Sequence, residues 1–372
     1  MGGESLHAVQ VGFYLDPRGR PPAQLLQDWP TLVDVAESAC QGGLRITVVQ
    51  ACHGPDILSR NGVRYHFFAR DADAPALICS LRPDVIHVHG LHFPREVLRL
   101  AAHLPEVPIL IQDHASGPPR LWRRPLYRRA FAAAAGVAFC ARPQSWPFES
   151  ARLIQPPTSI HVIPESSSRF TPGSRDEARA LTGLAGDPCL LWVGHLAANK
   201  DPLTVLEGVS RAVDALPRLE LWCCFGEAPL AKAVTERIER DGRLRGRVHL
   251  LGRRPHAQIE SLMRAADVFV SGSHREGSGY ALIEALACGL PPVVTDIPSF
   301  RTLTGDGAVA RLWERGEPQS LADELLGIAA DLGPARRARV RAHFDRELSF
   351  PALGRNLAAC YRSLVSGCAG RQ

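Results

Sequence analysis

Short apolar runs bounded by turn-forming residues alternate with helix-length segments along both halves of the chain. This alternation predicts parallel sheets whose strands are joined by crossover helices. In the first half, the expected strands are 9–14, 45–51, 85–89, 109–112, 136–140 and 159–163. In the second half they are 189–193, 219–225, 248–251, 268–271 and 292–295. The sequence therefore predicts an α/β protein with two doubly wound, Rossmann-like domains.

The chain length also indicates two domains, because 372 residues exceed the roughly 250–300 at which a single core stops growing. The segment 164–188 is rich in Ser, Pro and Gly, a composition typical of an interdomain linker. We expect an N-terminal domain over 1–170, a linker over 171–187 and a C-terminal domain over 188–345. Helix-forming sequence over 346–372 is expected to cross back onto the first domain.

Composition excludes several classes of protein. Hydrophobic residues make up 45% and charged residues 22% of the chain, as in ordinary globular proteins. No apolar run approaches the roughly 20 residues of a membrane span, and the first residues lack the apolar core of a signal peptide, so we expect a cytoplasmic protein. The ten cysteines show no CxxC spacing, which predicts reduced thiols and no zinc site.

Arginines are densest from Arg120 to Arg129, where Trp122 and Leu126 lie among them. This mixture is typical of peripheral contact with an anionic membrane, here its inner face, or of a solvated helix face. Because no recognition motif accompanies the charge, nucleic acid is not an expected partner.

A glycine-rich turn over 272–279 separates the strand over 268–271 from a helix expected over 280–288. Glycines allow close approach of a ligand, and the positive end of a helix favours phosphate oxygens. Glu276 and Glu284 frame this turn, about 9–12 Å apart at 1.5 Å per helical residue. They are either a dipole partner and a solvated side chain, or ligand contacts. Glu284 lies in a mostly apolar helix and needs a polar partner, such as a ribose diol.

The run from His274 to Gly289, HREGSGYALIEALACG, resembles the signature of glycosyltransferase family four. The resemblance extends upstream through 193–200, VGHLAANK, and downstream through 292–297, PVVTDI. It implies a GT-B fold, in which two Rossmann-like domains face each other across a cleft and close over the donor. It also implies retaining transfer of a sugar from a nucleotide-diphosphate sugar to an acceptor, with that sugar as co-substrate and with no cofactor or metal.

The resemblance also implies roles for individual residues. Glu276 would contact hydroxyls of the transferred sugar, and Glu284 would contact the ribose. The donor phosphates and sugar would meet the backbone of Gly277, Ser278, Gly279, Tyr280 and Ala281.

A basic pair after the first strand of the second domain neutralises the leaving diphosphate in this family. Gly194 and Lys200 match its positions, but His195 stands where relatives have Arg. Because His offers only a titratable charge without a fork, we expect pH-dependent donor binding or help from another arginine. Arg253 lies where relatives shape the base pocket, or else is an exposed turn residue.

In the first half, His114 follows the strand over 109–112 and resembles the family's histidine near the reacting carbon. The family's glycine-rich loop is replaced by YLDPRGRPP over 14–22, so we expect unusual acceptor recognition. His87, His89 and His92 are close together, but no carboxylate or cysteine completes a ligand set, and no metal site is predicted.

Three other interpretations stay open. A nucleotide-sugar epimerase of the same fold would need no acceptor. A non-catalytic nucleotide-sugar binder would fit the His195 substitution and the altered first loop. A nicotinamide oxidoreductase fits less well, because Leu282 occupies the third glycine position of a fingerprint beginning at Gly277.

Overall fold

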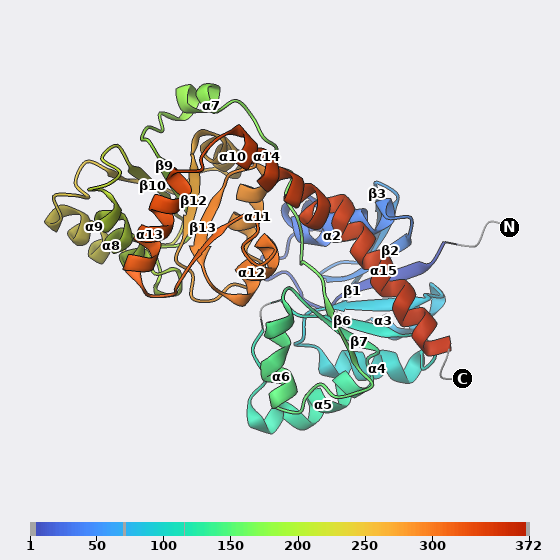
Figure 1. Cartoon of the computed structure of the whole chain (residues 1–372). Coiled ribbons are helices and arrows are strands. Elements are labelled where there is room, and N and C mark those ends of the chain that lie inside the picture. Colours follow the sequence, from blue (N-terminus) through green and yellow to red (C-terminus); the bar gives the residue numbers. More distant parts are fainter. Residues whose placement is uncertain (1–4, 70–71, 115, 370–372) are drawn as a thin grey trace. The chain divides into compact units, whose positions relative to one another are not determined.

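The computed structural model of the chain describes residues 5–69, 72–114 and 116–369. These residues form two compact units, each with its own sheet and core (Figure 1). The first unit comprises the residues up to Ser166 together with those from Phe350 onward, and the second runs from Ser167 to Ser349.

The first unit holds an eight-stranded sheet in the order β3-β4-β2-β1-β5-β6-β7-β8. Its strands are β1 (His7–Gly12), β2 (Arg45–Cys52), β3 (Asp56–Arg60), β4 (Val63–Ala69), β5 (Val85–His89), β6 (Ile109–Gln112), β7 (Gly136–Phe139) and β8 (Ser159–Val162). Neighbouring strands are parallel, apart from the antiparallel pair β3 and β4. Because β1 lies between β2 and β5, the strand order reverses there, and α/β proteins bind ligands at the carboxyl ends of strands beside such a switch point.

The β3–β4 hairpin was not predicted from the sequence. Its turn is Asn61–Gly62, a strong two-residue hairpin signal, and both residues have positive φ (47° and 82°). The apolar pattern of β3 is weak because this edge strand is mostly exposed. The turn residues were therefore the signal that could have found it.

The helices of the first unit are α1 (Pro22–Asp28), α2 (Pro30–Gln41), α3 (Ala74–Ser80), α4 (Pro94–His103), α5 (Arg124–Ala132), α6 (Trp146–Ser150) and α15 (Phe350–Ala369). The last of these, which we expected to return to the first domain, packs against α2 (Figure 1). A Cβ atom at Gly354 would lie 2.1 Å from the carbonyl oxygen of Ser38, so only glycine permits this approach of the two helices.

Tyr361 connects α15 to the sheet. Its hydroxyl lies 2.7 Å from Nδ1 of His87 and accepts a hydrogen bond of 3.2 Å from Nε2 of Gln10. Burial lowers the pKa of His87 to about 3, so this buried hydrogen bond joins the tyrosine hydroxyl to a neutral ring at pH 7.

We expect Tyr361→Phe to lower the free energy of unfolding by about 1–3 kcal/mol, because it leaves two buried polar groups without this partner. Denaturant unfolding measures the change, with Tyr14→Phe as control because Tyr14 is 56% exposed. Equal stabilities of the two variants would contradict the assignment of Tyr361 as the anchor of α15.

The second unit holds a six-stranded parallel sheet in the order β11-β10-β9-β12-β13-β14. Its strands are β9 (Cys189–Val193), β10 (Glu220–Cys224), β11 (Val248–Gly252), β12 (Val268–Ser271), β13 (Pro292–Thr295) and β14 (Arg311–Trp313). The predicted strands all form, and β14 is an addition of three residues, too short for a recognisable pattern. The order reverses between β9 and β12, which makes the carboxyl ends of these two strands the switch point of this sheet.

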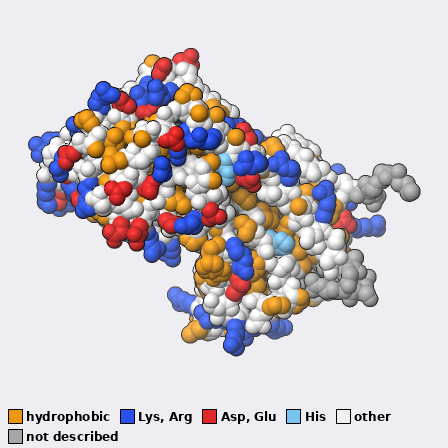
Figure 2. Space-filling view, viewed as in Figure 1, with side chains coloured by type: hydrophobic (Ala, Val, Ile, Leu, Met, Phe, Trp, Pro, Cys, Tyr) orange, Lys and Arg blue, Asp and Glu red, His pale blue; other side chains and the backbone are white. Residues whose placement is uncertain are grey.

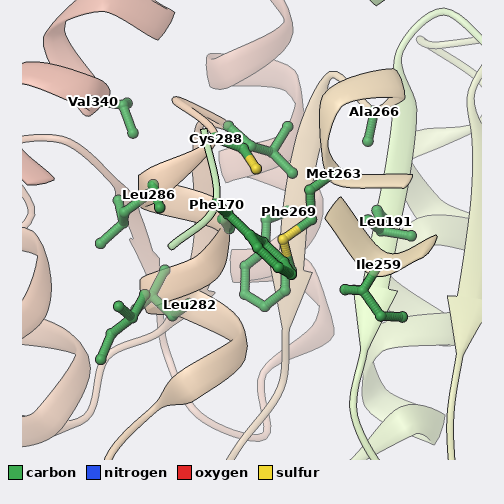
Figure 3. Packing of buried hydrophobic residues seen from close by; sticks show 14 of the residues in the cluster. Phe170, Leu191, Ile259, Met263, Ala266, Phe269, Leu282, Leu286, Cys288 and Val340 are labelled. Atoms are coloured by element: carbon green, nitrogen blue, oxygen red, sulfur yellow. The ribbon is translucent and has the colours of Figure 1, made fainter. Parts of the chain in front are cut away.

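Eight named helices surround this sheet: α7 (Arg175–Thr182), α8 (Pro202–Ala212), α9 (Ala231–Arg240), α10 (His256–Ala265), α11 (Tyr280–Ala287), α12 (Pro298–Thr304), α13 (Pro318–Ala329) and α14 (Pro334–His343). Asp201 caps α8 by accepting a hydrogen bond from the Thr204 amide, and Pro202 takes the first helical position. Figure 3 shows Phe170, Met263 of α10 and Phe269 of β12 close together in the core of this unit.

The segment 171–187, expected to be a linker, belongs to the second unit. Its helix α7 packs against α10, and Arg175 and Arg179 each bind a different oxygen of Asp267 at 2.8 Å. These contacts join residues about ninety positions apart, so the turn-rich composition of the segment concealed them.

Candidate functional site

Lys200 and Glu276 meet at the switch point of the second sheet. Lys200 ends the short helix η3 (Ala198–Lys200) that follows β9, and Glu276 lies in the turn that follows β12. The ammonium group of Lys200 forms an ion pair with Oε1 of Glu276, and the same oxygen accepts a 2.7 Å hydrogen bond from Ser273. The side chains are 23% and 15% exposed, so this is a partly desolvated pair that still reaches the surface.

The loops that carry these two residues are also bound to each other independently of the pair. The His274 amide donates to the carbonyl of Asn199 at 2.8 Å, and the Asn199 side chain donates to the carbonyl of Arg275 at 3.0 Å. Nε2 of His274 lies 2.8 Å from Oδ2 of Asp201. Sequence reasoning missed these supporting residues, because their contacts connect two loops more than seventy positions apart.

The glycine-rich turn leads directly into α11. Gly279 is the N-cap with φ of 65°, and a Cβ atom there would lie 2.7 Å from Leu303, so the position requires glycine on two counts. The carbonyl of Gly279 accepts from the amides of Leu282 and Ile283, which starts the helix. Amides before this point have no intrahelical acceptor, and the positive end of the helix dipole lies here. The arrangement is suited to an anion next to Glu276.

Glu284 lies farther along α11, and its partner in the structure is His256, not a ligand. Oε1 of Glu284 is 2.5 Å from Nε2 of His256, and the carboxylate side chain is only 14% exposed. Burial raises the pKa of Glu284, and the contact with His256 acts in the opposite direction. No local pattern indicated His256, which begins the preceding helix α10.

His195 and Arg253 converge over Gly226 at the ends of three neighbouring strands. A Cβ atom at Gly226 would lie 3.4 Å from the ring of His195 and 3.7 Å from the guanidinium of Arg253. Nδ1 of His195 accepts a 2.9 Å hydrogen bond from the amide of Glu227, which places the proton of the neutral ring on Nε2. The ring is thus oriented to donate from Nε2–H, and the guanidinium of Arg253 lies beside it. Gly194 packs against the Lys200 stem, because a Cβ there would lie 3.9 Å from Lys200 Cδ.

A pocket of about 730 Å³ opens at the switch point of the first sheet. Its lining includes Tyr14 after β1, His89 at the end of β5, and His114 after β6. Nδ1 of His114 lies 3.5 Å from Oε2 of Glu165, and the His114 ring stacks on His89 with centroids 5.6 Å apart. The imidazole is 37% exposed, so it is available to a ligand in the pocket.

The neighbouring histidines are engaged with other groups. His87 bonds Tyr361, and Nε2 of His92 lies 3.3 Å from the hydroxyl of Ser116. Burial lowers the pKa values of both His87 and His89. Over residues 5–69, 72–114 and 116–369, no three His, Cys, Asp or Glu side chains gather as a metal site would require. The cysteines whose side chains are described are free thiols.

Comparison with known proteins points to one family. Residues 187–331 match the model of the family described as glycosyl transferases group 1. The GDP-mannose:cellobiosyl-diphosphopolyprenol alpha-mannosyltransferase of Xanthomonas campestris is 28% identical over 306 residues, which are 78% of this chain and 77% of that protein. The D-inositol 3-phosphate glycosyltransferase of Geodermatophilus obscurus is 33% identical over 170 residues, 44% of this chain and 38% of that protein.

Solved structures resemble the chain over nearly its whole length. A glycosyltransferase from Rickettsia africae superposes with a TM-score of 0.72 at 12% identity, covering 98% of this chain and 99% of that one. The Anabaena protein HepE, solved in complex with UDP, gives a TM-score of 0.67 at 18% identity, covering 96% and 100%. At these identities the likeness concerns the fold. Among the described helices, none has the length and apolarity to span a membrane.

Proposed function

Because this chain is a group 1 glycosyltransferase with the GT-B fold, we propose that it moves a sugar from a nucleotide-diphosphate sugar to an acceptor hydroxyl. We further propose that the anomeric configuration is retained and that no metal ion takes part. The observation that carries the proposal is the Lys200–Glu276 pair at the switch point, immediately before the N-terminus of α11.

The donor diphosphate is proposed to lie between Lys200 and the start of α11. There the ammonium group provides positive charge, and five residues that lead into α11 and begin it provide backbone hydrogen-bond donors. These five residues are Gly277, Ser278, Gly279, Tyr280 and Ala281. Nε2–H of His195 and the guanidinium of Arg253 add donors at the neighbouring strand ends. Glu276 then accepts from sugar hydroxyls, and Glu284 accepts from the ribose.

The chemical step exchanges one bond of the anomeric carbon for another. The bond to the diphosphate oxygen breaks while the acceptor hydroxyl attacks on the same face, and a donor phosphate oxygen accepts the hydroxyl proton. Negative charge grows on the leaving diphosphate, where Lys200 and preorganised amides stabilise it. No carboxylate nucleophile is required by this scheme.

A panel of nucleotide sugars, screened by thermal shift and then by turnover, tests the proposal. We expect one donor to raise Tm, to release its nucleoside diphosphate only with sugar transfer, and to give a product with the donor's anomeric configuration by NMR. Excess EDTA should leave the rate unchanged. Inversion or loss of activity in EDTA would contradict the mechanism.

The same panel distinguishes a transferase from a nucleotide-sugar epimerase and from a non-catalytic nucleotide-sugar binder. Formation of an epimeric nucleotide sugar from donor alone would indicate an epimerase. Tight donor binding without turnover across a broad acceptor panel would indicate a binding protein.

The basic segment of the first unit is proposed to contact anionic lipid. Leu121 and Trp122 in η1 (Leu121–Arg123) are 74% and 75% exposed, and no Asp or Glu occurs from His114 to Phe148. Figure 2 shows Lys or Arg side chains beside hydrophobic ones along the edge formed by α5 and α6. Such a surface combines the charge and apolar anchors of peripheral proteins. Salt-sensitive cosedimentation with phosphatidylglycerol vesicles, but not with phosphatidylcholine vesicles, is the expected result, and equal binding to both would contradict it.

We expect Glu284→Gln to weaken donor binding and to stabilise the free protein at neutral pH. The ribose contact loses its charged acceptor, so Kd should rise about tenfold or more. Because burial raises the pKa of Glu284, its contribution to the free energy of unfolding is fully present below the ordinary value of 4.5 and is lost as pH rises through the folded-state pKa.

The glutamine variant lacks this titration, so its Tm should exceed that of wild type at pH 7 and not at pH 4. Calorimetric binding and thermal unfolding at both pH values measure the two effects. Glu239→Gln, at an exposed position, is the control. A wild-type donor Kd in Glu284→Gln would remove Glu284 from the donor site.

A further inference from the structure

The pocket of the first unit is mostly apolar, and its volume of about 730 Å³ lies in the range of sites that enclose a small organic ligand, about 300–1,000 Å³. Its apolar lining is formed by Tyr14, Trp29, Leu32, Val35, Val48 and Phe93. Among the described residues that line it, none is Lys or Arg, and Glu165 supplies a carboxylate. A phosphate group inside would therefore lose its hydration without gaining a cation.

The loop over 14–22, which replaces the family's glycine-rich one, contributes Tyr14 to the lining of this pocket. Asp16 and Arg20 form a two-oxygen ion pair with distances of 2.9 and 3.0 Å, and Arg20 also reaches Asp28 at 3.0 Å. The guanidinium lies 5.7 Å from the ring of Trp29, whose centroid is 6.0 Å from that of Tyr14. Two aromatic rings of the lining are thus held in place by charged groups that are not themselves part of the lining.

The lining residues from β1 and β2 are also fixed by their contacts. Gln50 donates a 2.7 Å hydrogen bond to the carbonyl of Tyr14, which fixes the start of the loop. A Cβ atom at Gly12 would lie 2.0 Å from Oε1 of Gln50, so glycine at this position makes room for that side chain. Among the polar groups of the lining, His114 and Glu165 meet, with Nδ1 of His114 3.5 Å from Oε2 of Glu165.

We propose that this pocket binds the acceptor through an uncharged apolar group, an aromatic or short alkyl aglycone, and places its hydroxyl beside His114 and Glu165. The inference rests on the proposed transferase function and specifies its acceptor class. An uncharged acceptor would distinguish this chain from the two relatives described above, whose names specify acceptors that bear phosphate. Trp29, immediately before α2, and Leu32, on α2, are then specificity-determining residues.

The test compares acceptors at a saturating concentration of the identified donor: phenyl and octyl β-glucosides, free glucose, and glucose 6-phosphate. We expect kcat/KM for the phenyl or octyl glucoside to exceed that for glucose at least about tenfold, as desolvation of one apolar group can provide. Glucose 6-phosphate should be the poorest of the four. A preference for glucose or for the phosphate ester would overturn the proposal.

Two substitutions of lining residues test whether the acceptor binds in this pocket. Thr31→Trp, at an exposed position of the lining, should raise KM for the apolar glucosides about tenfold by occupying the pocket. Leu32→Arg should do the same and should improve glucose 6-phosphate, because it adds the missing cation. Leu326→Arg, an exposed leucine of α13, is the matched control for the added charge. Circular dichroism establishes that each variant is folded.

Different results would contradict the proposed transferase function and the proposed acceptor pocket. If no nucleotide sugar is bound or consumed with any acceptor, the proposed transferase function is wrong. If donor is consumed and sugar transferred, but neither substitution of the lining changes the KM of any acceptor, the acceptor pocket alone is wrong.

Discussion

Lys200→Ala and Glu276→Gln should each lower kcat/KM at least about a hundredfold, a loss of roughly 2.7 kcal/mol of transition-state stabilisation. Lysine contributes a full charge where the leaving diphosphate becomes more negative, and Glu276 positions both the lysine and the donor sugar. The fold should persist, because hydrogen bonds from Asn199 and His274 hold the two loops together without this pair. Steady-state kinetics with the identified donor measure the loss.

The chain offers a matched control for this test. Lys232 is the second of only two lysines in the sequence and is 91% exposed on α9, so Lys232→Ala should retain wild-type activity. The double variant Lys200→Ala/Glu276→Gln should lose less than the sum of the single losses, because the two groups contact each other. Near-wild-type rates in both single variants would contradict the mechanism.

His114→Ala should lower kcat at least about a hundredfold, the lower end of what a positioned acid–base or hydrogen-bonding group contributes. The imidazole projects into the pocket of the first unit and is oriented by Glu165 on one side and by the His89 ring on the other. His114→Asn should recover part of the rate, since the amide keeps a hydrogen-bonding group at this position.

The control for His114 is His103→Ala, at an exposed position near the end of α4 in the same unit. Its kcat should equal that of wild type. If His114→Ala also retains wild-type kcat, the histidine belongs to the structure of the pocket and not to the reaction.

The elements that form the proposed donor site could be predicted from sequence because their signals are local. Gly279, the strand before it and the helix after it lie within about twenty residues, and Asp201–Pro202 marks the start of α8 by adjacent residues alone. The supporting contacts could not be predicted in this way. His256 reaches Glu284 across 28 positions, and Asn199 reaches Arg275 across 76.

His195 shows the same limit for chemistry. The residue type alone did not indicate the orientation of the ring, which depends on the Glu227 amide at a different strand end. The pocket of the first unit was harder to predict, because its lining includes residues of β1, β2 and α2 and of the loops after β1, β5, β6 and β8, without a contiguous motif.

The central claim is that the second unit binds the donor diphosphate between Lys200 and the N-terminus of α11. A crystal structure of the protein with its nucleoside diphosphate sugar tests this most directly. We expect phosphate oxygens within hydrogen-bonding distance of Lys200 Nζ and of the amides that begin α11. Glu276 should contact the sugar, and Glu284 should contact the ribose. A donor bound elsewhere, with these groups still paired to each other and to His256, would contradict it.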